Sequence, residues 1–156
     1  MLSISHAATG AFIAVKVTNP LLSIPLILAT HYLLDAVPHW DAGTGLTKKT
    51  ITPRQAFLQE IPDLILAGVL ILALYPSTLT LLSSPSLTLQ NTAPLWGGFL
   101  ALFPDFLEAP RNFLHFEPIW LKPINRFHHS FHHSIPKKLA GLLPQFLLLW
   151  LIWLFH

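Results

Sequence analysis

Histidines and carboxylates gather in two short stretches of this 156-residue chain. The first contains His31, Asp35, His39 and Asp41, and the second covers residues 128–133, which read His-His-Ser-Phe-His-His. On a helix, His31 and Asp35 would share one face, because residues four apart lie one above the other. Imidazole and carboxylate groups are both ligands for divalent cations. We therefore predict a metal site, with a purely structural histidine–aspartate hydrogen bond as the alternative.

The second stretch contains two histidine pairs at the same spacing. If it is helical, His128 lies one turn from His132, and His129 lies one turn from His133. Either pair could bind a divalent cation. The alternative is a solvated loop whose charge changes near neutral pH.

Two pairs of acidic residues, three apart, interrupt apolar runs: Glu60 with Asp63, and Asp105 with Glu108. Carboxylates near a helix N-terminus are favoured by the helix dipole, so the first pair has a simple alternative reading as caps. The second pair is expected at the C-terminal end of a helix, where negative charge is disfavoured. We therefore predict that Asp105 is a metal ligand and that Asp63 or Glu108 is a general base.

The remaining candidates follow from the same chemistry. His6 is a lone histidine in an apolar run, and Arg111, Arg126 and Lys137 could neutralise a phosphate. A serine nucleophile is not favoured, because no Gly-X-Ser-X-Gly turn is present. The full set of predicted metal ligands is His6, His31, Asp35, His39, Asp41, Asp105, His128, His129, His132 and His133.

The composition predicts an integral membrane protein. Hydrophobic residues make up 53% of the chain, charged residues 10%, and the mean hydropathy is +0.57. The absence of cysteine excludes disulfides, thiolate nucleophiles and cysteine-ligated metal. No basic run is interleaved with aromatic residues in the way that a nucleic-acid site requires.

Five apolar segments, near residues 2–17, 20–37, 57–75, 91–108 and 139–155, predict an all-α membrane bundle that forms a single domain over residues 1–156. A long loop precedes the last helix. Basic residues lie in that loop and in the loop after the second segment, whereas the connection around residues 76–90 has no charge. The positive-inside rule then places both basic loops and the N-terminus in the cytoplasm, and the C-terminus outside. All the predicted ligands fall near that inner face.

The motifs resemble those of the bacterial membrane-bound metal-dependent hydrolases, small inner-membrane proteins that include LexA-regulated members. His6 matches the early histidine of that family, and His31 with Asp35 matches its His-X-X-X-Asp helix. Asp105 partly matches its Pro-Asp turn, and residues 129–134 loosely match its His-Arg-X-X-Thr-His-Ser motif, without the arginine and threonine. The string that begins at His31 is also similar to zinc-dependent phospholipase C. The resemblance implies a multi-helix membrane protein with metal-dependent hydrolase activity.

The sequence thus predicts a hydrolase of the prokaryotic inner membrane that uses metal-activated water at the cytoplasmic face. The expected cofactor is one or two divalent ions, zinc first, with manganese or iron as alternatives. A phosphoester or lipid-linked substrate is expected from the location of the site beside the bilayer. The main alternative is a non-catalytic metal-binding membrane protein, such as a cation transporter or sensor. A haem-binding bundle is a third reading, which the accompanying carboxylates oppose.

Overall fold

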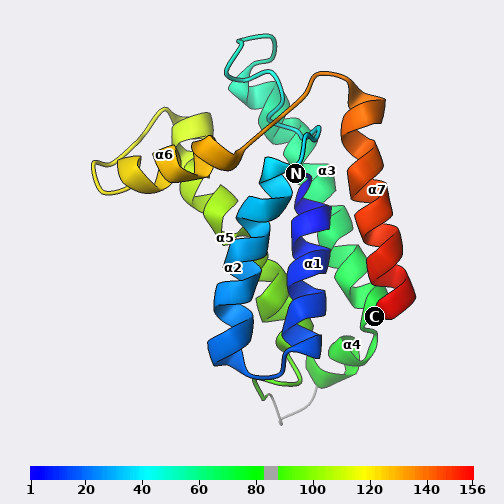
Figure 1. Ribbon diagram of the computed structural model, residues 1–156. Helices are drawn as coiled ribbons and strands as arrows, with labels where there is room; N and C mark the ends of the chain where they lie inside the picture. Colours follow the sequence, from blue (N-terminus) through cyan, green and yellow to red (C-terminus); the bar gives the residue numbers. More distant parts are fainter. Residues whose placement is uncertain (83–87) are drawn as a thin grey trace.

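The computed structural model describes residues 1–82 and 88–156, and within these ranges it contains seven helices and no strand (Figure 1). They are α1 (Ser3–Lys16), α2 (Pro20–Ala36), α3 (Pro53–Leu74), α4 (Ser77–Leu82), α5 (Ala93–Leu114), α6 (Lys122–Phe131) and α7 (Lys138–Phe155). The predicted all-α class is confirmed, and each of the five predicted apolar segments corresponds to a helix, namely α1, α2, α3, α5 and α7.

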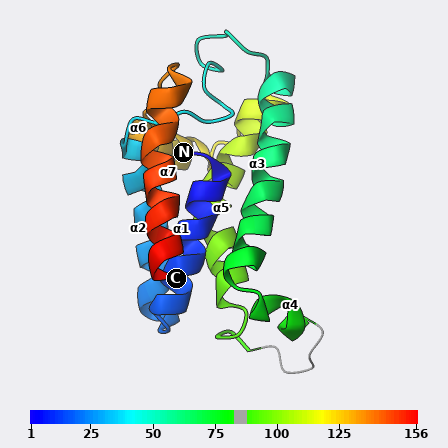
Figure 2. The ribbon, with the colours of Figure 1, turned by 90° about the vertical axis from the view of Figure 1, so that its right-hand side faces the viewer.

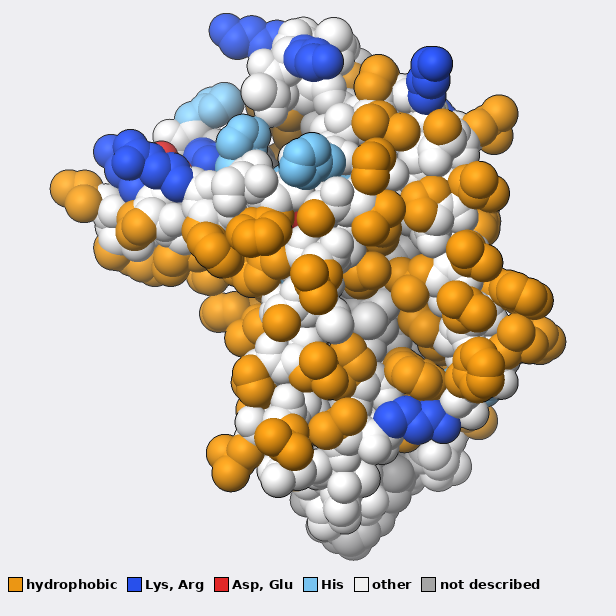
Figure 3. Space-filling view, in the orientation of Figure 1, with side chains coloured by type: hydrophobic (Ala, Val, Ile, Leu, Met, Phe, Trp, Pro, Cys, Tyr) orange, Lys and Arg blue, Asp and Glu red, His pale blue; other side chains and the backbone are white. Residues whose placement is uncertain are grey.

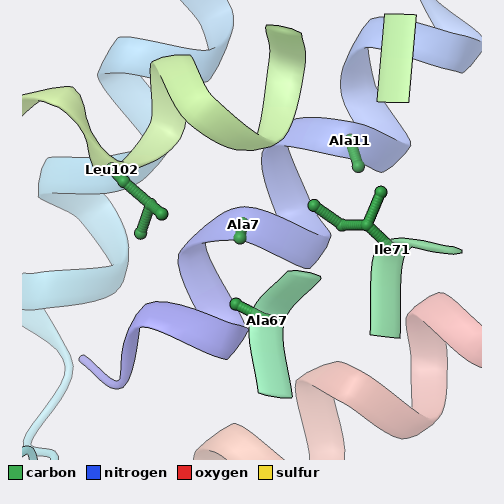
Figure 4. Close-up of a cluster of buried hydrophobic side chains, with 5 residues drawn as sticks. All are labelled: Ala7, Ala11, Ala67, Ile71 and Leu102. Atoms are coloured by element: carbon green, nitrogen blue, oxygen red, sulfur yellow. The ribbon is translucent and has the colours of Figure 1, made fainter. Parts of the chain in front are cut away.

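Helix α1 runs through the middle of the bundle and contacts α2, α3, α5 and α7 (Figures 1 and 2). Its central position follows from its small side chains, which let neighbouring backbones approach closely. A Cβ on Gly10 would lie 2.2 Å from the carbonyl oxygen of Gly97 in α5, so neither position tolerates a side chain without movement. One core cluster joins α1 to α3 and α5, and it consists of Ala7, Ala11, Ala67, Ile71 and Leu102 (Figure 4).

Three features of the chain differ from the sequence predictions. The predicted end of the fourth segment at residue 108 was wrong, because α5 continues through Pro110 to Leu114. Proline removes one helical hydrogen bond without always ending a helix. Helix α3 begins at Pro53, earlier than predicted, where Thr52 and Gln55 form a capping box. The long loop before α7 contains the unpredicted helix α6. Within the predicted connection at 76–90, residues 83–87 lie outside the described part of the chain.

The bundle carries much of its apolar surface on the outside (Figure 3). Helices α3 and α7 are long and apolar enough to cross a membrane, and most of each helix is not buried against the rest of the protein. Helix α2 is apolar but shorter. Among the described helices, length and composition therefore support two spans, and a bundle of five spans stays a prediction.

Helix α6 lies across the end of the bundle that carries the N-terminus (Figure 1). Its exposed apolar side chains include Ile124 and Phe127, whereas Lys122 and Arg126 are exposed polar residues of the same helix. Figure 3 shows apolar side chains on the underside of this projection and basic side chains above them. A helix with two such faces is typical of the boundary between a membrane and water.

Candidate metal centre

Four residues that are far apart in the chain meet at the end of the bundle near the N-terminus. His31 and Asp35 come from the last turns of α2, Asp105 from α5, and His128 from α6. Each offers one ligand atom, and the four atoms all lie within 4.8 Å of one another. Their convergence, which the sequence predicted, creates a group that could hold a metal ion; we call it the first group.

The distances within the first group suit a tetrahedral ion. The Nε2 atoms of His31 and His128 are 3.3 Å apart, and Asp35 Oδ2 lies 3.4 Å from the former and 2.9 Å from the latter. Asp105 Oδ1 lies 3.7 Å from Nε2 of His31 and 3.6 Å from Nε2 of His128. Tetrahedral ligands ~2.0–2.1 Å from zinc are about 3.3–3.4 Å from each other. The apo arrangement already approaches that geometry.

Hydrogen bonds set the tautomers of two of the histidines. His31 Nδ1 donates to the carbonyl oxygen of Ala101 at 2.7 Å, and His39 Nδ1 donates to that of Val37 at 2.8 Å. Because a carbonyl can only accept, the ring proton lies on Nδ1 in both cases. In the neutral rings, Nε2 then presents its lone pair toward the cluster, as a metal-binding histidine requires.

A second group lies beside the first and shares Asp35 with it. It contains Asp35, His39 and His132, and their ligand atoms also lie within 4.8 Å of one another. The Nε2 atoms of His39 and His132 are 3.3 Å apart. Asp41 Oδ2 lies 2.9 Å from His39 Nε2 and 3.2 Å from His132 Nε2, so Asp41 could add a further ligand.

Asp35 turns one carboxylate oxygen toward each group. Oδ2 is nearest His128, at 2.9 Å, whereas Oδ1 lies 3.1 Å from His6 Nε2 and 3.9 Å from His39 Nε2. The amino group of Met1 also donates to Oδ1. Asp35 is fully buried, and a buried carboxylate is costly unless cations or donors surround it. A carboxylate with this placement could bridge two ions.

The second group depends on two chain segments that pair just beyond helix ends. Helix α2 stops before Pro38, and the next residue, His39, forms an isolated parallel bridge with Ser134. The backbone N–H of His39 donates to His133 at 3.1 Å, and that of Ile135 donates to His39 at 2.7 Å. This pairing places the His132 ring beside that of His39.

Charges near the second group shift its titration. Burial alone would raise the pKa of Asp41, but hydrogen bonds from His132 and His39 outweigh it and hold that pKa well below its usual range. Burial opposes the charged form of His132, yet its hydrogen bond to Asp41 raises its pKa above 6.5. The pKa of His128 is also raised, because its hydrogen bond to Asp35 outweighs burial. Protons therefore compete with a metal for both imidazoles.

The other predicted ligands lie around these groups without joining either one. His6 is buried, stacks on His31 with ring centroids 4.1 Å apart, and reaches only Asp35 among the carboxylates. His129 and His133 are exposed, and the His133 ring donates to the carbonyl oxygen of Phe131. Their role as ligands stays a prediction.

The two predicted general bases hold structural positions. Asp63 lies in the middle of α3 and accepts hydrogen bonds from the backbone N–H groups of Ser3 at 2.5 Å and Ile4 at 3.2 Å. It thus caps α1, a neighbouring helix, rather than its own. Glu108 pairs with Arg111 and lies 3.6 Å from His128 Nδ1, where a carboxylate can orient a ligating imidazole.

The predicted phosphate-binding residues are less concentrated. Arg111 is paired with Glu108, and Glu117 lies 3.8 Å from its other terminal nitrogen. Arg126 and Lys137 are exposed. No two of these cations face one another across the metal groups in the described interactions, so phosphate binding by this set stays a prediction.

Sequence reasoning missed Gln145, which ties the site together from α7. Its Nε2 donates to the carbonyl oxygens of Trp40 at 2.7 Å and Gly141 at 2.8 Å, and its Oε1 accepts from the N–H of Leu2 at 2.8 Å. A single buried amide in an apolar helix was the signal that could have revealed it.

A cavity of about 270 Å³ opens beside the second group. Three candidate ligands line it, namely Asp41, Asp105 and His132. Asp105 is the most accessible ligand of the first group, with a side chain 33% exposed, compared with 1% or less for His31, Asp35 and His128. Substrate or water could reach the centre from this side.

Comparison of the chain with protein-family models, with curated proteins and with solved structures found no match. The fold and the site therefore define the class: a helical bundle with two candidate membrane-spanning helices and buried histidine–aspartate groups that could hold a metal ion. The resemblance to the membrane-bound hydrolases stays a prediction from the motifs.

Proposed function

We propose that this protein is a membrane-embedded metal-dependent hydrolase with two divalent ions bridged by Asp35. The observation that carries this proposal is the division of Asp35 between two ligand groups, with Oδ2 toward His128 and Oδ1 toward His39. Two ions held ~3.5–4 Å apart are typical of enzymes that break phosphoester bonds. Zinc is the first candidate, because the ligands are imidazoles and carboxylates without thiolate.

The proposed reaction is hydrolysis of a phosphoester. Ion-bound water loses a proton near neutral pH, and its oxygen attacks phosphorus. The P–O bond to the alcohol breaks, and the leaving oxygen takes up the proton that the water released, giving an alcohol and a phosphate. Asp105 is the ligand best placed to receive that proton first, since it lies at the boundary between the first group and the cavity. Glu108 would hold His128 in its ligating orientation.

We place the centre at the cytoplasmic face of a prokaryotic inner membrane. The apolar surfaces of α3 and α7 support the embedding, and the two-faced helix α6 supports a membrane boundary near the site. Basic side chains gather at the same end of the molecule (Figure 3). The positive-inside rule then favours a cytoplasmic N-terminus.

The decisive experiment combines metal content with turnover of a soluble ester. The purified protein, loaded with zinc, should bind two ions per chain and hydrolyse p-nitrophenyl phosphate or its diester. His31→Ala should abolish turnover, whereas the matched variant His156→Ala, at the opposite end of α7, should leave it unchanged. Bound metal with no turnover of any phosphoester would favour the non-catalytic transporter or sensor. Absence of stoichiometric metal would refute both functions.

A further inference from the structure

The cavity beside the second group has two chemically different walls. On one side stand Asp41, Asp105 and His132, the candidate ligands. The opposite wall is apolar, and it consists of Leu46, Phe57, Leu64, Phe106 and Phe113. A pocket with a reactive polar end and an apolar wall fits a molecule that is itself divided into a polar head and an apolar chain.

The apolar wall continues onto the outer surface of the bundle. Phe57 of α3 is 49% exposed and Phe106 of α5 is 38% exposed, although both line the cavity. Farther along α3, which is apolar enough to span a membrane, Ile61 and Ile65 are also exposed. A chain that leaves the cavity past Phe57 would therefore meet the bilayer rather than water.

The volume limits what the cavity can hold. About 270 Å³ lies just below the ~300–1,000 Å³ of most small-molecule sites. That space suits one headgroup and the first part of a single chain. The remainder of the chain would have to stay outside, among the lipids.

The charges determine when an anionic headgroup can enter. Besides the ligand carboxylates, Glu60 and Glu108 line the cavity, and the lining Arg111 is already paired with Glu108. Without metal the cavity is acidic and repels an anion. Two divalent ions would outweigh the carboxylates of Asp35, Asp41 and Asp105 and leave a net attraction for phosphate.

We propose that the substrate is a phosphoester of a long-chain alcohol or single-chain lipid drawn from the bilayer. Its phosphate binds at the ions, and its chain passes between α3 and α5 along Phe57 and Phe106. This inference rests on the proposed function for its chemistry, but the cavity predicts binding independently of turnover.

The test uses a non-hydrolysable alkyl phosphonate with a photoreactive diazirine midway along its chain, added to the zinc-loaded protein in lipid nanodiscs. Mass spectrometry should place the cross-links on the lining residues of α3 and α5, and chelation of the metal should abolish them. Ala109→Trp fills the cavity from α5, and Ala73→Trp is its matched control on an exposed site of α3. The cross-link yield should fall about tenfold in the first variant, which removes the space for several methylenes, and not in the second.

The outcomes separate this inference from the proposed function. Metal-dependent cross-links in the cavity, without hydrolysis of p-nitrophenyl phosphate, would support the binding site and refute the enzyme. Turnover of the soluble ester with cross-links spread equally over the lipid-facing helices would keep the enzyme and overturn the cavity as the lipid site. Retained metal content in Ala109→Trp shows that this variant is folded.

Discussion

The two halves of the metal centre are built in different ways. In the first group every ligand lies on a helix, namely α2, α5 or α6, and only Asp105 is appreciably exposed. In the second group, His39 and His132 lie just beyond the ends of α2 and α6, and the cavity reaches His132 and the adjoining Asp41. Helices hold side chains more rigidly than the segments that follow them. The first half is thus suited to retain an ion, and the second to exchange ligands with substrate.

This difference predicts that only Asp35 controls both halves. Asp35→Asn keeps the size of the side chain but removes the charge that both ions would share. We expect both ions to be lost, with affinities reduced by more than the ~10–100-fold of a second-shell change. Inductively coupled plasma mass spectrometry of the dialysed protein measures the stoichiometry.

The matched control is Asp63→Asn, which weakens the cap on α1 without touching either group. It should retain two ions and lose about 1 kcal/mol of unfolding free energy. If Asp35→Asn keeps one ion at full affinity, then Asp35 does not bridge.

The halves should separate when ligands specific to each are removed. His31→Ala should eliminate the first ion, and His132→Ala the second, so each variant retains about one ion per chain. The remaining ion in His132→Ala should exchange with the radioactive isotope more slowly than that in His31→Ala, because the first group is more buried. Equal exchange rates would contradict the contrast between a closed and an open half.

A change outside the ligands should damage the second half alone. A Cβ on Gly141 of α7 would lie 2.4 Å from the backbone nitrogen of Trp40 and 2.8 Å from the carbonyl carbon of His39. Gly141→Ala must therefore shift the segment that carries His39, and we expect the second ion to bind about 10-fold more weakly. Isothermal titration of the second ion measures this effect.

The matched control is Gly68→Ala, since a Cβ there meets nothing within 4 Å. In that helical position alanine should be neutral or stabilise by ~0.5–1 kcal/mol, with unchanged metal binding. An equal loss of the first ion in Gly141→Ala would show that the two halves move together.

The smallest expected effect is on pH. The raised pKa values of His128 and His132 mean that both imidazoles bind protons more readily than a free histidine. Zinc affinity should rise as pH increases through these values and then level off. Without metal the sign reverses: the stability that protonation of His132 contributes is complete below about pH 6.5 and is lost as pH rises through its raised pKa. Thermal melts with and without zinc from pH 5 to pH 9 distinguish the two slopes.

Much of the helical framework could be predicted because apolar runs and helix periodicity are local properties of the chain. The two groups on α2 and α6 could be found from spacing alone, as could the convergence of His31, Asp35, Asp105 and His128. The role of Asp63 could not, since a sequence places that carboxylate near an apparent helix start. Only the packing of α3 against α1 shows which N–H groups it caps.

The amino-acid sequence by itself determined the all-helical class, the apolar surface and the supply of imidazole and carboxylate ligands on elements that end near one face. These depend on composition and on contacts between residues a few positions apart. The tertiary structure alone decided that Asp35 is shared between two groups, that His39 lies beside His132, and that a cavity adjoins them. Those relations join segments nearly a hundred residues apart, and they are set to within an ångström by the close packing of small residues on α1.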